Sequence, residues 1–174
     1  MLKVAIVGTG WWGMELGKAA RAVSKNIELA GCTSLSSAES ETFQKAYGGK
    51  VYKDYAEILA DASVQAVMLA TPHSTHSDQI VQAAKAGKHV FCEKPFTLTV
   101  ESGQRAMQAC EQARVVLAVG HNRRYLPGAR RMKAMVEAGD LGQVLHVEAS
   151  YAGNGAFSRP PTHWRSKREE MPCG

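Results

Sequence analysis

The sequence has no apolar run near the roughly 18 residues that a membrane-spanning helix needs. Near its amino end it also lacks a long apolar core followed by a small-residue cleavage site, so we expect a cytoplasmic protein with no membrane partner. Its 45% hydrophobic and 21% charged residues are typical of soluble globular proteins. Secreted and membrane-embedded classes are therefore not expected.

Closely spaced cysteines are missing as well. No Cys-x-x-Cys pair and no His/Cys cluster at zinc spacing occurs, and the cysteines are far apart, namely Cys32, Cys92, Cys110 and Cys173. We therefore expect free thiols and no metal site.

The net charge of +5 comes largely from the last third of the chain. The basic residues there are Arg123, Arg124, Arg130, Arg131, Lys133, Arg165, Lys167 and Arg168. No nucleic-acid-binding motif surrounds them, so we expect a solvated face or a site for phosphorylated ligands rather than a nucleic-acid partner.

Predicted strands and helices alternate through the first 121 residues. Short apolar runs predict strands at 3–7, 27–33, 51–52, 65–70, 89–92 and 115–119, and amphipathic spacing predicts helices at 13–24, 38–47, 54–60, 78–86 and 100–113. This alternation predicts the α/β class, with a doubly wound parallel sheet in a domain of residues 1–121.

The pattern changes in residues 122–174. A helix is predicted at 128–138, and period-two alternation predicts a strand of an antiparallel sheet at 143–151. One strand cannot form a sheet alone. We therefore interpret 122–174 as the incomplete beginning of a second, α+β domain. The alternative to an incomplete domain is that this strand pairs with the first domain or with another chain.

A glycine-rich turn, Gly8-x-Gly10-x-x-Gly13, lies between the first predicted strand and helix. In that context the motif predicts a Rossmann dinucleotide-binding turn, with a pyrophosphate at the helix N-terminus. The acid expected about 20 residues later is absent, because residues 32–37 contain only small, apolar and hydroxyl side chains, including Ser34. The hydroxyls mildly favour NADP, yet no arginine is adjacent, so NAD and NADP both stay open. An ordinary loop and N-cap role for these serines is equally consistent.

Two further segments follow predicted strands at the same edge of the sheet. Thr71 and His76 could contact ribose or nicotinamide, although this segment alone would also suit a helix-capping loop. Glu93 and Lys94 follow the fifth strand, where Lys94 could act as a general acid or base and Glu93 as an anchor.

These motifs together resemble the Gfo/Idh/MocA oxidoreductase family (relatives of glucose-fructose oxidoreductase and inositol 2-dehydrogenase). The matching segments are 8–13, 70–72 with His76, 87–90, 93–95, 120–125, 139–142 and Trp164-Arg165, in family order. The resemblance implies an NAD(P)-dependent dehydrogenase for a sugar, cyclitol or related hydroxylated small molecule, and a homo-oligomer in the complete protein. It also implies that the Lys94–Pro95 peptide bond is open to the cis state.

By the resemblance, Lys94 is the catalytic lysine. The expected cofactor-binding residues are Gly8, Thr9, Gly10, Trp11, Trp12, Gly13, Ser34, Ala70, Thr71, Pro72, His76, Glu93, Lys94, Pro95, Asn122, Arg123, Trp164 and Arg165. The sequence stops where the family's second catalytic motif would begin, so we expect a truncated chain with little turnover alone. The alternatives are a non-catalytic dinucleotide sensor or interaction module on the same fold and, less favoured, a methyltransferase.

Overall fold

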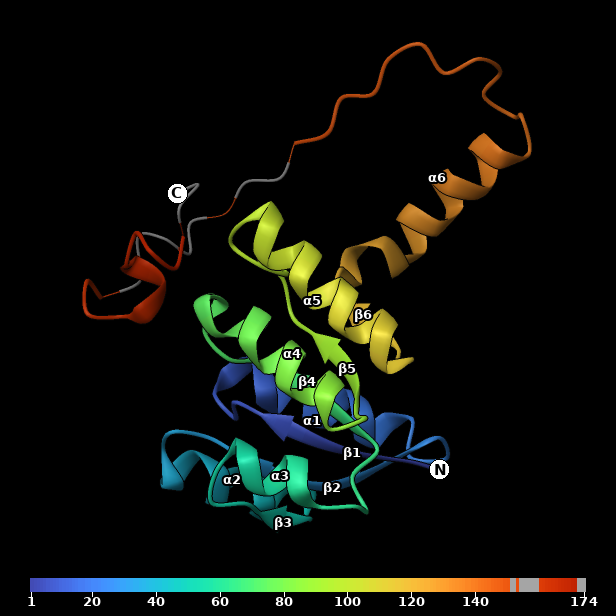
Figure 1. The fold of residues 1–174 in the computed structure, drawn as a ribbon. Coiled ribbons are helices and arrows are strands. Elements are labelled where there is room, and N and C mark those ends of the chain that lie inside the picture. The colour runs from blue at the N-terminus through green and yellow to red at the C-terminus, as the bar shows by residue number, and fades with distance from the viewer. Residues whose placement is uncertain (151–152, 154–159, 172–174) are drawn as a thin grey trace.

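A computed structural model of the chain describes residues 1–150, 153 and 160–171. Its centre is a six-stranded sheet in the order β3-β2-β1-β4-β5-β6, and every neighbouring pair is parallel (Figure 1). The strands are β1 (Leu2–Val7), β2 (Ile27–Thr33), β3 (Lys50–Val51), β4 (Ala66–Leu69), β5 (His89–Cys92) and β6 (Leu117–Val119). The predicted doubly wound parallel sheet is confirmed. Its strand order reverses between β1 and β4, which is where such sheets bind ligands.

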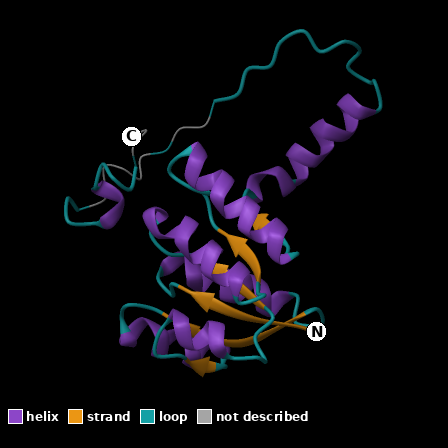
Figure 2. Cartoon of the chain, viewed as in Figure 1, coloured by secondary structure: helices purple, strands orange, loops and turns teal. Residues whose placement is uncertain are grey.

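Helices alternate with these strands along the chain (Figure 2). They are α1 (Trp11–Ala22), α2 (Ser37–Tyr47), α3 (Tyr55–Ala60), α4 (His76–Lys85) and α5 (Val100–Ala113), with the short 3-10 turn η1 (His73–Thr75) before α4. The side chain of Asp54 accepts the Glu57 N–H at 2.9 Å, so Asp54 is the N-cap of α3. Both α1 and α4 begin two residues before the predicted starts, so α1 opens inside the glycine motif.

Successive residues of β1 pack on opposite faces of the sheet. Ala5 and Val7 belong to the larger core, which includes Ile80 of α4, whereas Ile6 packs with Phe43 of α2 on the other face. Burying a side chain as large as Ile6, Phe43 or Ile80 contributes about 1.5–3 kcal/mol to the stability of the fold. The two cores hold helices on both faces and fix the loops that follow each strand.

The segment after β6 leaves the sheet. It contains η2 (Asn122–Tyr125), α6 (Pro127–Glu137) and η3 (Trp164–Ser166), and α6 projects away from the sheet with no buried residue (Figure 1). The predicted strand is wrong over its described part, because residues 143–150 form no strand and are exposed. No strand in the described part of the chain lies beside it, and its backbone therefore has no ladder partner. Tyr151, the last residue of that prediction, lies outside the described residues.

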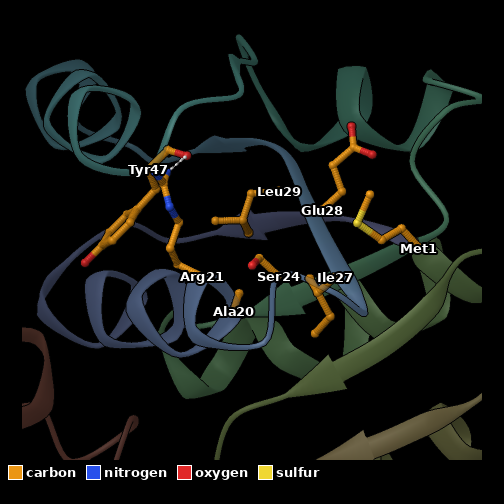
Figure 3. Close-up of a pocket in the computed structure, with 8 residues that line it drawn as sticks. All are labelled: Met1, Ala20, Arg21, Ser24, Ile27, Glu28, Leu29 and Tyr47. Atoms are coloured by element: carbon orange, nitrogen blue, oxygen red, sulfur yellow. Dashed lines mark hydrogen bonds between the residues drawn. The ribbon is translucent and has the colours of Figure 1, made fainter.

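A hollow of about 240 Å³ lies at the amino ends of β1 and β2, opposite the edge where the glycine turn is (Figure 3). It is bordered by Met1, Ile27 and Arg21, and Arg21 Nη1 donates to the Tyr47 carbonyl at 3.2 Å. Among the described residues, no helix is long and apolar enough to cross a bilayer, and no cluster of three or more His, Cys, Asp or Glu is placed to hold a metal.

Candidate functional site

The glycine turn joins β1 to α1 with very little space around two of its glycines. Gly8 has φ +90°, a conformation that side chains other than glycine rarely adopt, and a Cβ there would lie 2.7 Å from the Ala70 carbonyl oxygen. A Cβ on Gly13 would lie 2.1 Å from the Gly8 carbonyl oxygen. These two glycines therefore allow the turn to pack against β4 and α1.

Gly10 differs from the other two. A Cβ on Gly10 would meet only Glu39 Oε1, at 3.9 Å, so the space in front of this residue is open. Gly10 is also the N-cap of α1. Among the described residues no side chain caps that helix, and its first turn has no acid. The unpaired N–H groups of the first turn therefore face open space, a favourable arrangement for an anion.

Two buried polar atoms beside the turn have no hydrogen-bond partner among the described residues. They are Thr9 Oγ1 and Trp12 Nε1. Thr9 is only 2% exposed, and an unpaired buried hydroxyl costs free energy. A ligand with acceptor oxygens at this turn would satisfy such donors.

A cavity of about 410 Å³ opens beside the turn, at the carboxyl ends of β1, β2 and β4. Of the predicted site residues, it is lined by Gly8, Gly10, Ser34, Ala70, Thr71, Pro72 and Trp164. Thr9 and Trp11 border a shallower hollow that shares Gly10 and Glu39 with this cavity. The prediction stays untested for ligand contact, but the structure brings these residues together.

Several lining residues were missed by the sequence reading. They are Leu35, Glu39, Lys53, Asp54, Tyr55, Thr75 and Gln79. Glu39 is notable because Ser34 Oγ donates to its Oε2 at 2.7 Å. A carboxylate from the first turn of α2 thus lies beside the residue that follows β2.

The floor of the cavity is a polar network. Thr75 Oγ1 donates to the Pro72 carbonyl at 2.7 Å, and Thr71 Oγ1 donates to Gln79 Oε1 at 2.6 Å. The Tyr55 hydroxyl donates to the Gln79 carbonyl at 2.8 Å, and burial raises the pKa of Tyr55 well above its usual value. These contacts hold the β4–α4 loop in one conformation.

His76 lies beneath this loop and is fully buried. Its Nδ1 lies 2.9 Å from the Pro95 carbonyl oxygen and its Nε2 lies 3.1 Å from the Thr71 carbonyl oxygen. Both ring nitrogens are therefore engaged with the main chain. His76 joins the cavity loop to the loop after β5 and is not itself a lining residue.

The loop after β5 carries Glu93, Lys94 and Pro95. Glu93 is 6% exposed, and a Cβ on Gly120 would lie 2.6 Å from its Oε1, so Gly120 makes room for the carboxylate. The Lys94 N–H donates to Glu93 Oε2 at 3.2 Å, and the Lys94–Pro95 bond is cis. Lys94 is exposed at the carboxyl end of β5, the edge that also carries the glycine turn.

Residues 160–171 return to the sheet domain and pack on η1. The ring of Trp164 lies edge-on to His73 with centroids 4.8 Å apart, and the Arg165 guanidinium carbon lies 4.1 Å from the Trp164 ring centroid. Ser74 donates to Glu170 from its N–H at 2.9 Å and from its Oγ at 2.5 Å. This segment therefore brings Trp164 to the cavity, whereas Asn122 and Arg123 lie exposed in η2.

The residues present fit a dinucleotide. The open space at Gly10, the uncapped helix N-terminus and the unpaired Thr9 hydroxyl suit a pyrophosphate, and the cavity suits the groups attached to it.

Comparison with known proteins agrees with this reading. Residues 2–121 match the GFO_IDH_MocA family, described as an oxidoreductase family with an NAD-binding Rossmann fold. Glucose-6-phosphate 3-dehydrogenase of Bacillus subtilis is 31% identical over 166 residues, which cover 95% of this chain and 46% of that protein.

Two solved structures are also similar. Scyllo-inositol dehydrogenase from Lactobacillus casei, with bound NAD(H) and scyllo-inositol, is 30% identical with a TM-score of 0.77, over 82% of this chain and 43% of that one. An oxidoreductase from Desulfitobacterium hafniense, provisionally named NADPH-dependent, is 28% identical with a TM-score of 0.89, over 98% of this chain and 49% of that one. The chain thus spans about half the length of these relatives or less. It belongs to the Gfo/Idh/MocA oxidoreductase family and carries that family's NAD-binding Rossmann fold.

Proposed function

We propose that this chain is the cofactor-binding part of a dehydrogenase that exchanges a hydride between a nicotinamide dinucleotide and a carbinol of a cyclitol or sugar. The observation that carries the proposal is the arrangement at one edge of the sheet. The glycine turn and cavity lie there, and His76 connects the cavity loop at Thr71 to the loop of Lys94 through Pro95.

When bound, the nicotinamide supplies hydride exchange at its C4 atom. In the proposal, the α1 N-terminus and Gly10 hold the pyrophosphate, and Trp164 closes one side of the cavity. Lys94 moves the proton of the reacting hydroxyl, a role open to a lysine beside a ligand at a strand end. Glu93, held next to it, orients the Lys94 main chain and anchors a ribose.

We propose further that residues 122–174 begin a second domain, which completes the substrate site and contributes to a homo-oligomer in the complete protein. Support comes from α6, which has no buried residue and exposes Met132 and Val136, and from the greater length of the relatives. The buried free thiols of Cys32, Cys92 and Cys110 support a reducing, cytoplasmic location.

The test separates binding from chemistry. In a protein extended to the length of the relatives, Lys94→Ala should leave the dinucleotide affinity within about threefold and lower kcat by about 100-fold or more with a cyclitol or sugar. Unchanged turnover in this variant would contradict the role of Lys94, whereas dinucleotide binding without turnover in the unsubstituted protein would favour a non-catalytic binding module.

A further inference from the structure

We propose that Glu39 takes the place of the carboxylate missing from the end of β2, receives the ribose hydroxyls of the adenosine half, and makes this chain select NAD over NADP. This inference rests on the proposed dinucleotide function and goes beyond it by assigning the choice of cofactor phosphate. Relatives named for NAD(H) and for NADPH both exist, so that choice has to come from residues of this chain.

Glu39 lies close to the position where an acid of this fold binds the ribose. In this fold an acid after β2 binds the ribose 2′-hydroxyl, and a 2′-phosphate at the same place is excluded by that charge. Glu39 lies five residues beyond Ser34 in the chain, yet Ser34 Oγ donates to its Oε2 at 2.7 Å. The carboxylate therefore lies against the residue that follows β2.

The Glu39 side chain points toward the cavity. Ser36 is the N-cap of α2 and its side chain accepts the Glu39 N–H at 3.4 Å. A glutamate at this N3 position commonly turns back to the N-cap N–H in a capping box. Here the carboxylate instead extends to Ser34 and lies 3.9 Å from the position of a Cβ on Gly10. It therefore faces the glycine turn and the cavity.

The charges around the cavity also bear on the choice between NAD and NADP. Its lining residues include the carboxylates of Glu39 and Asp54 and one cation, Lys53. Lys53 also lies close enough to lower the pKa of the Glu57 carboxyl, after the larger effects of hydrogen bonds from Lys50 and from the Lys53 main chain. Leu35, which follows Ser34, is fully exposed and offers no charge to a 2′-phosphate. The cavity therefore favours two neutral hydroxyls over an added dianion.

The experiment is a calorimetric titration of this chain with NAD and with NADP. We expect NAD to bind at least about tenfold more tightly, since a charged hydrogen bond is gained and a charge repulsion avoided. Glu39→Gln keeps the side-chain length and removes the charge, and it should bring the two affinities within about threefold. Glu41→Gln removes the same charge from the exposed surface of α2 and serves as the matched control, with the wild-type ratio expected.

A second measurement examines the adenosine end alone. ADP should bind more tightly than adenosine 2′,5′-bisphosphate, and Glu39→Gln should remove that preference. The inference is overturned if the wild type prefers NADP or if Glu39→Gln leaves the wild-type ratio unchanged. Failure of the wild type to bind any of these compounds would instead overturn the proposed function together with the inference.

Discussion

His76 is hydrogen-bonded to Pro95 across two loops that are far apart in the sequence, with 2.9 Å between its Nδ1 and the Pro95 carbonyl oxygen. Since its Nε2 also meets the Thr71 carbonyl, one buried ring holds the cavity loop and the Lys94 loop at a fixed separation. The histidine thereby couples the proposed cofactor site to the proposed catalytic lysine.

Replacing His76 should therefore loosen both loops. His76→Ala should lower the free energy of unfolding by about 2–4 kcal/mol, because the packing of a fully buried ring and its hydrogen bond to a loop carbonyl are lost. Denaturant titration measures this loss. His121→Ala, at an exposed position, is the control and should change stability by no more than about 0.5 kcal/mol. A His76 variant as stable as this control would contradict the bridging role.

The tight packing at Gly13 gives a second prediction. Gly13→Ala should destabilise the chain by about 2–4 kcal/mol, because its Cβ would lie 2.1 Å from the Gly8 carbonyl oxygen and force the turn apart. Gly128→Ala is the matched change, since a Cβ there meets nothing within 4 Å in the first turn of α6. We expect that control to be neutral or slightly stabilising. Equal melting temperatures for the two variants would show that the turn is not packed as described.

Docking of residues 160–171 should weaken at acid pH. Burial lowers the pKa of His73 below 6.5, so the docked form binds fewer protons and loses stability as pH falls through that range. Burial raises the pKa of Glu170, but the hydrogen bonds from Ser74 outweigh that effect, and the pKa lies below its usual value of 4.5. Its contribution is therefore present above about pH 4.5 and is lost below it.

Trp164 fluorescence in this chain reports the release, because the ring contacts His73 when docked. We expect a change from pH 7.5 down to 5 and a further change below pH 4.5. Glu170→Gln should remove the lower step, whereas Glu169→Gln, on an exposed neighbour, should keep both. A flat profile would contradict the docked position of this segment.

The sheet and its glycine turn could be predicted from the sequence because their signals are local. Strand and helix periods alternate, and Gly8 and Gly13 lie where only glycine fits. Glu39 could not be predicted as a site residue, since it lies beyond the residues directly after β2 and its contact with Ser34 depends on how α2 follows β2. The strand expected at 143–151 failed because alternation predicts one face of a sheet but cannot supply the partner strand.

The role of His76 also could not be predicted from the sequence. Its place after Ala70-Thr71-Pro72 indicated a residue near the cofactor, but the pairing of β4 with β5 is what brings Pro95 to its ring. Sequence spacing identified the segment, and only the tertiary structure showed that its ring nitrogens are engaged by the main chain.

Gly10 offers the most direct measurement of the central claim, that a dinucleotide binds at the glycine turn. A Cβ on Gly10 meets only Glu39 Oε1 at 3.9 Å, so Gly10→Val should fold normally while filling the space in front of the α1 N-terminus. In calorimetric titration with NAD we predict saturable one-to-one binding to the wild type and a loss of at least about 30-fold in the folded variant. Equal NAD affinity in the two proteins, or no binding to the wild type, would contradict the account.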